Sequence, residues 1–130
     1  MEVIIIGAGL AGSEAALQLA KRNIRVKLYE MRPQKTTGAH VTENCAEFVC
    51  SNSLGSADIT NASGLLKAEM QELGGELINI AYECRVPAGN ALAIDRIGFS
   101  KKITDLIEKN ENIELVREEL KEIPTDKPVI

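Results

Sequence analysis

Aromatic side chains are scarce in this sequence, and long apolar runs are absent. Aromatic residues make up 3% of the 130 residues, and tryptophan does not occur. The core must therefore be aliphatic, which is typical of a parallel sheet buried under helices. The longest apolar stretch is far shorter than the ~20 residues that cross a membrane, and no secretory signal is visible. We therefore expect a cytoplasmic protein without a membrane partner.

Cysteine and basic residues are also limited, and both limits exclude classes of site. The three cysteines include no CxxC pair, so neither a disulfide framework nor a zinc centre is expected, and no other metal site is indicated. Reduced thiols are the simpler interpretation. Lys and Arg number 15 against 19 Asp and Glu, which gives a net charge of −4. A stand-alone nucleic-acid binder is basic, so any RNA surface must be local or supplied elsewhere.

The most informative motif is a glycine-rich turn that follows the apolar run Val3–Ile6 and precedes a helix-like stretch. Gly7 allows a tight turn, Gly9 allows the backbone to approach a pyrophosphate, and Gly12 allows the helix to lie close to a sheet. A pyrophosphate then binds the free N–H groups at the helix N-terminus. The cofactor-binding candidates of this turn are Gly7, Ala8, Gly9, Leu10, Ala11 and Gly12.

An acidic residue ends the next apolar run. Glu30 lies close to the expected ~20 residues beyond the turn, where a carboxylate accepts hydrogen bonds from a ribose. A 2′-phosphate would meet Glu30 as a like charge, so FAD or NAD fits this position better than NADP. Strand, turn, helix and acid together predict a dinucleotide site. The alternative is a structural turn in an ordinary α/β protein.

Apolar periodicity predicts one α/β domain over residues 1–130, with a Rossmann-like parallel sheet and flanking helices. The segment Met31–Asn61 is polar and irregular, and Gly74-Gly75 is expected to break a long helix. Pro128–Ile130 resembles the entry into another strand, so we expect the N-terminal part of a longer, truncated enzyme. Strands are predicted at Val3–Ile6, Val26–Glu30, Ala91–Ile94 and Ile113–Arg117, with further extended chain at Glu119–Ile123, and helices at Leu10–Arg22, Ser63–Glu83 and Gly98–Lys109. Their predicted inward faces include Leu66, Met70, Leu73, Leu77, Ile80, Ala81, Phe99, Ile103, Leu106 and Ile107.

Cys50 is the candidate nucleophile. It lies between an apolar run and the hydrogen-bonding cluster Ser51–Ser53, which suits a reactive thiol in a cofactor cleft. A positive charge nearby would favour its thiolate, which is the nucleophilic form. The residues able to supply that charge are Arg32, Lys35, His40 and Arg96. The alternative is that Cys50 is a small buried hydrophobe.

Five other polar or thiol residues have open roles. His40 is either a solvated loop residue or faces a ligand. Asp95 and Arg96 follow a strand of small residues, and they either contact cofactor or substrate or form a salt bridge and helix cap. Cys45 is expected to be a free thiol rather than a disulfide partner of Cys50, and Cys84 to be structural.

Several motifs in order resemble the N-terminal part of one family across essentially the whole chain. They are IIIGAGLAGSEAALQLAKR at Ile4–Arg22, YEMRP at Tyr29–Pro33, AEFVCSNSL at Ala46–Leu54, TNASGLLKAEM at Thr60–Met70, RVPAGNALAIDR at Arg85–Arg96, and GFS at Gly98–Ser100. The string closely resembles the folate- and FAD-dependent tRNA uracil-5-methyltransferases, the TrmFO/Gid family. The EMRP and VCSNS segments are far more specific than the glycine motif.

The resemblance implies a mechanism. FAD is bound, a one-carbon unit comes from methylenetetrahydrofolate, NAD(P)H supplies reducing equivalents, and C5 of uridine 54 in the tRNA T-loop is methylated. Cys50 matches the family cysteine that is implied to engage the uracil covalently, because uracil C5 becomes nucleophilic once a thiolate adds at C6. The further cofactor-binding residues implied are Glu30, Met31, Arg32, Ser51, Asn52, Ser53 and Asp95.

Two departures and two alternatives accompany the resemblance. The family is several times longer, so its second catalytic cysteine, folate site and most of its RNA surface lie beyond Ile130, and Gly55 stands where the family has a basic residue. The related flavoprotein that modifies the tRNA wobble uridine is expected to carry a Cys-Asn-Pro loop, which differs from Cys50–Ser53. A non-catalytic dinucleotide-binding module is the other alternative. Unpaired strand edges predict some tendency to associate, and the oligomeric state is left open.

Overall fold

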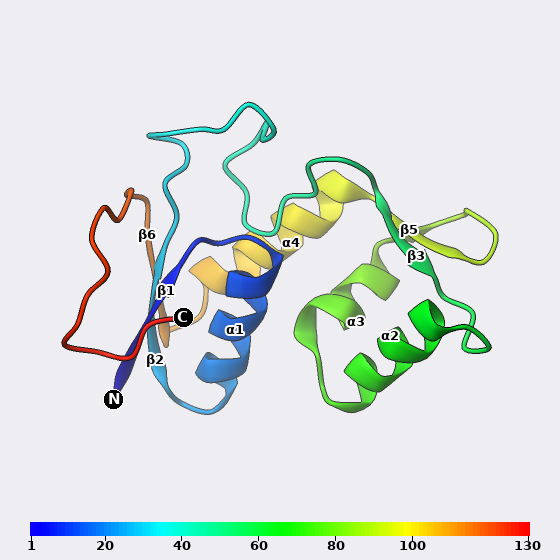
Figure 1. Ribbon diagram of the computed structural model, residues 1–130, viewed down its shortest axis with the longest axis horizontal. Helices are drawn as coiled ribbons and strands as arrows, with labels where there is room; N and C mark the ends of the chain where they lie inside the picture. The colour runs from blue at the N-terminus through cyan, green and yellow to red at the C-terminus, as the bar shows by residue number, and fades with distance from the viewer.

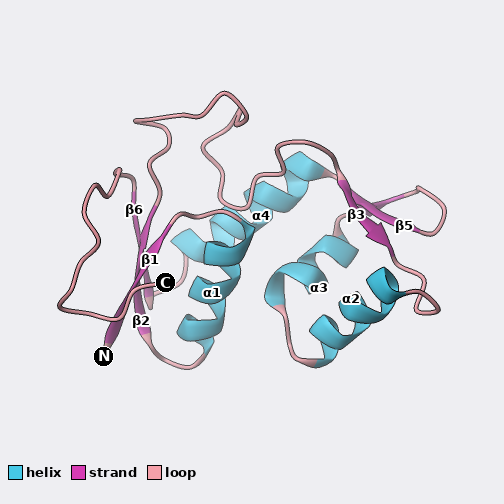
Figure 2. Cartoon of the chain, viewed as in Figure 1, coloured by secondary structure: helices cyan, strands magenta, loops and turns pink.

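The computed structural model describes residues 1–130 as two small sheets with helices between them (Figure 1). The strands are β1 (Glu2–Ile6), β2 (Arg25–Tyr29), β3 (Ser53–Ser56), β4 (Arg85–Val86), β5 (Ala91–Ile94) and β6 (Ile113–Val116). The helices are α1 (Leu10–Lys21), α2 (Ala62–Glu72), α3 (Glu76–Glu83) and α4 (Arg96–Glu108). Figure 2 shows that long loops connect these elements, above all after β2 and after β6. None of the helices is long and apolar enough to cross a membrane.

The first sheet is parallel, as the sequence predicts. Its strand order is β1-β2-β6, and Ile4 of β1 pairs with Lys27 of β2. Ile4 also forms a parallel bridge to Val129, and the Ile130 N–H donates to the Ile4 carbonyl at 2.9 Å. The expected extended chain at Pro128–Ile130 is therefore confirmed, on the free edge of β1.

An aliphatic core joins this sheet to the helices. Fully burying one Val, Leu or Ile side chain stabilises the fold by about 1.5–3 kcal/mol, so each buried strand and helix residue adds to the stability of the core. Helix α1 contributes the small residues Ala16 and Ala20, which let it lie close to the strands. The main buried residues of the strands and of α3 and α4 are Val3, Ile5, Val26, Leu28, Leu77, Ile80, Leu92, Ile94, Phe99, Ile103 and Ile107.

The second sheet is antiparallel, with the order β3-β5-β4, and the sequence analysis did not predict it. Strand β5 matches the predicted Ala91–Ile94, but β3 lies inside the segment predicted to be irregular. Strand β3 is polar and contains Gly55 at φ +79°, and β4 has only two residues, so neither shows a period of alternating apolar residues. The prediction of extended chain at Glu119–Ile123 is wrong, because these residues form no strand.

The predicted long helix breaks where two glycines adjoin. Gly74 has φ +78°, and Gly75 is the N-cap of α3, so α2 and α3 are separate helices. The inward face predicted for α3 is confirmed, since Leu77, Ile80 and Ala81 are buried.

The inward face predicted for α2 is wrong, as is one position of α4. Leu66, Met70 and Leu73 are 56%, 41% and 83% exposed, and Leu106 of α4 is 42% exposed. Helix α2 buries only Gly64 and Lys67, because it packs against β3 and α3 and no further element covers its other side.

Candidate functional site

The glycine turn connects β1 to α1 in the way that the motif predicts. Gly7 has φ +99°, a left-handed conformation that glycine adopts without a steric penalty, and its N–H donates to the Tyr29 carbonyl at 2.8 Å. Gly9 is the N-cap of α1 and offers no side-chain oxygen, and the first turn of α1 carries no acidic residue. The N–H groups that begin α1 are therefore available to an anion outside the helix.

The other two glycines differ in their surroundings. A Cβ atom at Gly12 would lie 1.9 Å from the Gly7 carbonyl oxygen, so only glycine lets α1 lie this close to the end of β1. A Cβ atom at Gly9 would meet nothing within 4 Å, because the space in front of it is open. Gly12 therefore serves the packing of the helix, and Gly9 faces the side from which a ligand arrives.

Glu30 follows β2 and turns its carboxylate toward this turn. Its Oε2 accepts the Ala8 N–H at 3.0 Å, and its Oε1 accepts the backbone N–H of Arg32 at 3.1 Å and Nε of Arg32 at 2.8 Å. Burial raises the pKa of Glu30, but the hydrogen bonds from Arg32 and Ala8 outweigh it and leave the pKa below the ordinary value. Glu30 is therefore an ionised acceptor at neutral pH.

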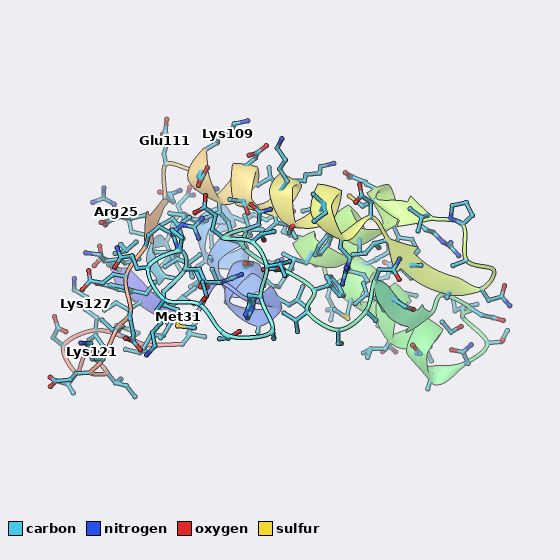
Figure 3. All side chains as sticks on the ribbon, turned by 90° about the horizontal axis from the view of Figure 1, so that it is seen from above. Arg25, Met31, Lys109, Glu111, Lys121 and Lys127 are labelled. Carbon is cyan, nitrogen blue, oxygen red and sulfur yellow. The ribbon has the colours of Figure 1, made fainter.

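A pocket of about 370 Å³ joins the turn to this acid. It lies at the carboxyl ends of β1 and β2, where parallel sheets commonly bind ligands. Met31 is at the parallel-sheet end of the molecule, on the side where the C-terminal segment carries Lys121 and Lys127 (Figure 3). The lining residues are Ile6, Gly7, Gly9, Tyr29, Glu30, Met31, Arg32, His40, Glu118, Glu119 and Leu120.

Arg32 lines the pocket, but its guanidinium is held by other groups. Its side chain is 1% exposed and forms ion pairs with Glu30 through Nε and with Glu47 through Nη1, both at 2.8 Å. Nη1 also donates to the Thr42 carbonyl at 3.1 Å. Arg32, one of the four residues predicted to be able to supply a charge to the Cys50 thiol, is therefore committed to two carboxylates.

Cys50 is exposed and lies in the loop before β3, with its neighbours on a second pocket. This pocket of about 460 Å³ is lined by Ser51, Asn52, Ile94, Asp95, Arg96 and Ile97. The Asn52 amide donates to the Ile94 carbonyl at 3.2 Å, and the Asp95 side chain accepts from the Gly98 N–H at 3.1 Å as the N-cap of α4. The helix-cap interpretation of Asp95 is thus confirmed, and Asp95 also lines this second pocket.

The predicted cofactor-binding residues line three separate pockets, except for Ala8, Gly12 and Ser53, which line none of the three. Gly7, Gly9, Glu30, Met31 and Arg32 share the first pocket, which we call the nucleotide pocket after the ligand that the glycine motif predicts. Ser51, Asn52 and Asp95 share the second, and the two have no lining residue in common. Leu10 and Ala11 line a third, apolar pocket of about 280 Å³ with Phe48, while Ala8 and Gly12 lie inside the turn and Ser53 begins β3.

The structure also gives the surroundings of the remaining thiols and of His40. Cys45, Cys50 and Cys84 are all free, as predicted. Burial raises the pKa of the Cys45 thiol and of the Cys84 thiol, which suits structural roles. His40 lines the nucleotide pocket, and its Nδ1 lies 2.6 Å from the Thr37 hydroxyl, so the ligand-facing interpretation gains support.

Sequence reasoning missed two buried charges. Glu47 bonds Arg32 and also accepts the backbone N–H of Val41 at 3.0 Å. Lys67 is 6% exposed, and its ammonium donates to the Ser56 carbonyl at 2.9 Å and to the Ser63 hydroxyl at 2.7 Å; burial lowers its pKa. For Glu47, the available sequence signal of a buried charge was an isolated acid after two small residues. For Lys67, which lies on a helix with exposed leucines, the sequence gave no such signal.

Comparisons with known proteins place the chain among relatives of one kind. A family model described as glucose inhibited division protein A matches residues 2–130. Relatives named methylenetetrahydrofolate–tRNA-(uracil-5-)-methyltransferase TrmFO are 58% identical over 129 residues in Fusobacterium nucleatum and 59% identical over 129 residues in Aquifex aeolicus. These alignments cover 99% of this chain and 30% and 29% of those relatives, so the chain spans about a third of their length.

A solved structure, titled crystal structure of CtdE in complex with FAD and substrate 4, aligns with a TM-score of 0.45 and 17% identity. The alignment covers 88% of this chain and 30% of that one, and the similarity is too low to define the fold. The fold follows instead from the parallel sheet and helices described above, as the sequence predicted.

Proposed function

The chain belongs to the glucose inhibited division protein A family, and from this premise we propose that its nucleotide pocket binds the ADP part of FAD. The observation that carries the proposal is the meeting of free helix N–H groups, open space before Gly9, and the ionised carboxylate of Glu30 on one pocket. A diphosphate needs the N–H groups, and a ribose diol needs the carboxylate.

The residues of the pocket fit this group chemically. The N–H groups that begin α1 bind the diphosphate, and Glu30 accepts hydrogen bonds from the ribose hydroxyls. Met31 and His40 contribute further lining from the segment after β2. When bound, FAD supplies the redox and one-carbon carrier chemistry, with methylenetetrahydrofolate as the carbon donor and NAD(P)H as the reductant.

The whole activity that we propose is methylation of uracil C5 in the T-loop of tRNA, at uridine 54. Cys50 is the proposed nucleophile because it is the one exposed cysteine of the chain. Its thiolate adds to uracil C6, the S–C6 bond forms, and the C5–C6 electron pair moves into an enolate, which makes C5 nucleophilic. After C5 gains its carbon, loss of the C5 proton and of the thiolate restores the ring.

Ser51, Asn52, Ser53 and Asp95 would orient the Cys50 loop and its ligand, since the Asn52 amide ties the loop to β5. The loop carries Ser after Cys50, which favours this activity over the wobble-uridine enzyme expected to have Cys-Asn-Pro. We also propose a cytoplasmic location, which is where tRNA and folate meet.

Titration with FAD tests the binding proposal directly. We expect flavin fluorescence to change on adding the chain and a Glu30→Ala variant to bind at least about tenfold more weakly, because a charged hydrogen bond contributes about 1.5–3 kcal/mol. A Glu43→Ala variant is the control, since Glu43 is exposed and its carboxylate has no partner. No binding by the unaltered chain would reject the proposal.

Activity is tested in a polypeptide that joins this chain to the residues following the matched segment of the Aquifex aeolicus relative. We expect methyl transfer to tRNA uracil C5 with methylenetetrahydrofolate, lost on Cys50→Ser and kept on Cys84→Ser. FAD binding without transfer would favour the non-catalytic module, and transfer that survives Cys50→Ser would remove Cys50 as the nucleophile.

A further inference from the structure

The nucleotide pocket rests on a buried chain of three charges. Glu30, Arg32 and Glu47 have side chains that are at most 6% exposed, and Arg32 bridges the two carboxylates. Two negative charges and one positive charge leave the cluster with a net charge of −1. Hydrogen bonds with the backbone hold all three charges in place: the Ala8 N–H donates to Glu30, the Val41 N–H donates to Glu47, and Arg32 donates to the Thr42 carbonyl.

The position of Arg32 corresponds to that of an Arg which accommodates a 2′-phosphate in some dinucleotide-binding folds. In dinucleotide-binding folds, an acid at the end of the second strand binds the ribose diol, and a nearby Arg accommodates a 2′-phosphate when one is present. Arg32 comes just after that acid and lines the same pocket. Its Nη1 donates to the Glu47 carboxylate and to the Thr42 carbonyl, so the negative charge of Glu47 balances part of the positive charge of Arg32.

We propose that Glu47 is a specificity-determining residue that rejects nucleotides carrying a 2′-phosphate. This proposal rests on the proposed nucleotide site. Arg32 shares its one positive charge between Glu30 and Glu47, so the cluster keeps a net charge of −1 that repels a phosphate. Without the charge of Glu47, the cluster would be neutral, and Glu30 would be the only carboxylate that holds the guanidinium lining the pocket. Glu47 acts through Arg32 and does not itself line the pocket.

Other charges at the pocket do not replace this role. Glu118 and Glu119 also line the pocket, and Glu119 forms a surface ion pair with Lys35 at 2.5 Å. Solvent screens these surface charges, whereas the buried pair of Arg32 and Glu47 is screened much less. The effect of Glu47 should therefore persist in moderate salt.

The test compares two ligands that differ only by the 2′-phosphate, ADP-ribose and its 2′-phosphorylated form. Their dissociation constants are measured by calorimetry for the chain and for E47Q, which keeps the shape of the side chain and an oxygen for the Val41 N–H. The control is E43Q, the same change at an exposed position of the same loop. E47D, which retains the charge, tests rescue.

We expect the unaltered chain to prefer ADP-ribose by at least about tenfold, and E47Q to reduce this preference at least about fivefold. E43Q and E47D should keep the preference, although E47D can weaken both ligands together. A purely structural role of Glu47 would lower both affinities and leave their ratio unchanged.

Each result decides between the two proposals. If ADP-ribose binds but the ratio is unchanged in E47Q, the role of Glu47 is overturned and the nucleotide site stands. If ADP-ribose does not bind the unaltered chain, the nucleotide site itself is overturned. Should E47Q fail to fold, a ratio near one in the unaltered chain, or a lost preference in E47D, overturns the role of Glu47.

Discussion

Gly12→Ala and Gly9→Ala should have different consequences, although both glycines belong to one motif: the first should lower stability and the second should weaken FAD binding. In an exposed helix, changing glycine to alanine gains about 1 kcal/mol. At Gly12 the new Cβ would lie 1.9 Å from the Gly7 carbonyl oxygen, and real Cβ atoms keep at least 3.0 Å, so α1 must move by about 1.1 Å. The same Cβ would also lie 3.2 Å from Cγ2 of Ile5, so the sheet blocks this movement.

Overpacking of this kind costs about 1–3 kcal/mol and sometimes more, and the shift also loosens the contacts of Ala16 and Ala20. Because the contact with the Gly7 carbonyl is so short, we expect a gross cost of about 3–4 kcal/mol. After the helix gain of about 1 kcal/mol, Gly12→Ala loses about 2–3 kcal/mol net, which lowers the Tm by about 6–10 °C in a chain of this size. Gly9→Ala meets no atom within 4 Å and should change the Tm by less than about 3 °C. It should instead weaken FAD binding at least about tenfold, because its methyl group occupies the approach to the diphosphate.

Thermal unfolding followed by circular dichroism gives the two Tm shifts, and fluorescence titration with FAD gives the affinities. The reasoning fails if Gly12→Ala is as stable as the unaltered chain, because the close approach of helix and strand would then not exist. It fails separately if Gly9→Ala binds FAD normally, because the diphosphate would then lie elsewhere.

Three further predictions concern charge, thiols and the exposed helix. Because the pKa of Glu30 is lowered on folding, its stabilising contribution is complete above the ordinary value of 4.5 and is lost as pH falls through the folded-state pKa. Urea midpoints followed from pH 7 to about pH 3 should show this loss, and a Glu30→Gln variant should lose less over the same range, because only its other carboxylates of lowered pKa, such as Glu47 and Asp58, still titrate. An equal loss in both proteins would contradict the role of Glu30. Iodoacetamide should label Cys50 first and Cys45 last, as read by peptide mass spectrometry, and early labelling of Cys45 would show that its burial is wrong. Leu73→Ala should cost less than about 0.5 kcal/mol in urea unfolding and Leu77→Ala about 2–4 kcal/mol; equal costs would contradict the burial of only the second.

The parallel sheet was predictable because its signals are local. Buried parallel strands give continuous apolar runs such as Val3–Ile6, and the glycine turn fixes where α1 begins. The break at Gly74-Gly75 was predictable for the same reason, since Gly74 adopts the positive φ that a glycine allows. The strands of the second sheet carried no such signal, because Ser53–Ser56 is polar and short.

The exposed face of α2 shows a different limit. Apolar residues at helical spacing indicate a buried face, but they do not say whether this chain supplies the partner. Leu66 and Leu73 satisfy the pattern and still lie in solvent. In the relatives, of which this chain spans about a third, other residues are available to cover such a face.

In the candidate site, the residues next to one another in the chain were predictable and the long-range charge partners were not. Glu30 was identified from its spacing to the turn, and it lies on the pocket with Gly7 and Gly9. The bond from Arg32 to Glu47 depends on how the intervening loop folds back, which no periodic pattern encodes. Arg32 was therefore expected to be available, and it is instead enclosed by two carboxylates.

A crystal structure of the chain with FAD tests the central claim most directly. The account predicts the diphosphate at the N–H groups that begin α1, beside Gly9, with the ribose hydroxyls on the carboxylate of Glu30. An adenosine diphosphate group bound at the apolar pocket near Phe48, or at the pocket of Ser51 and Asn52, would contradict it.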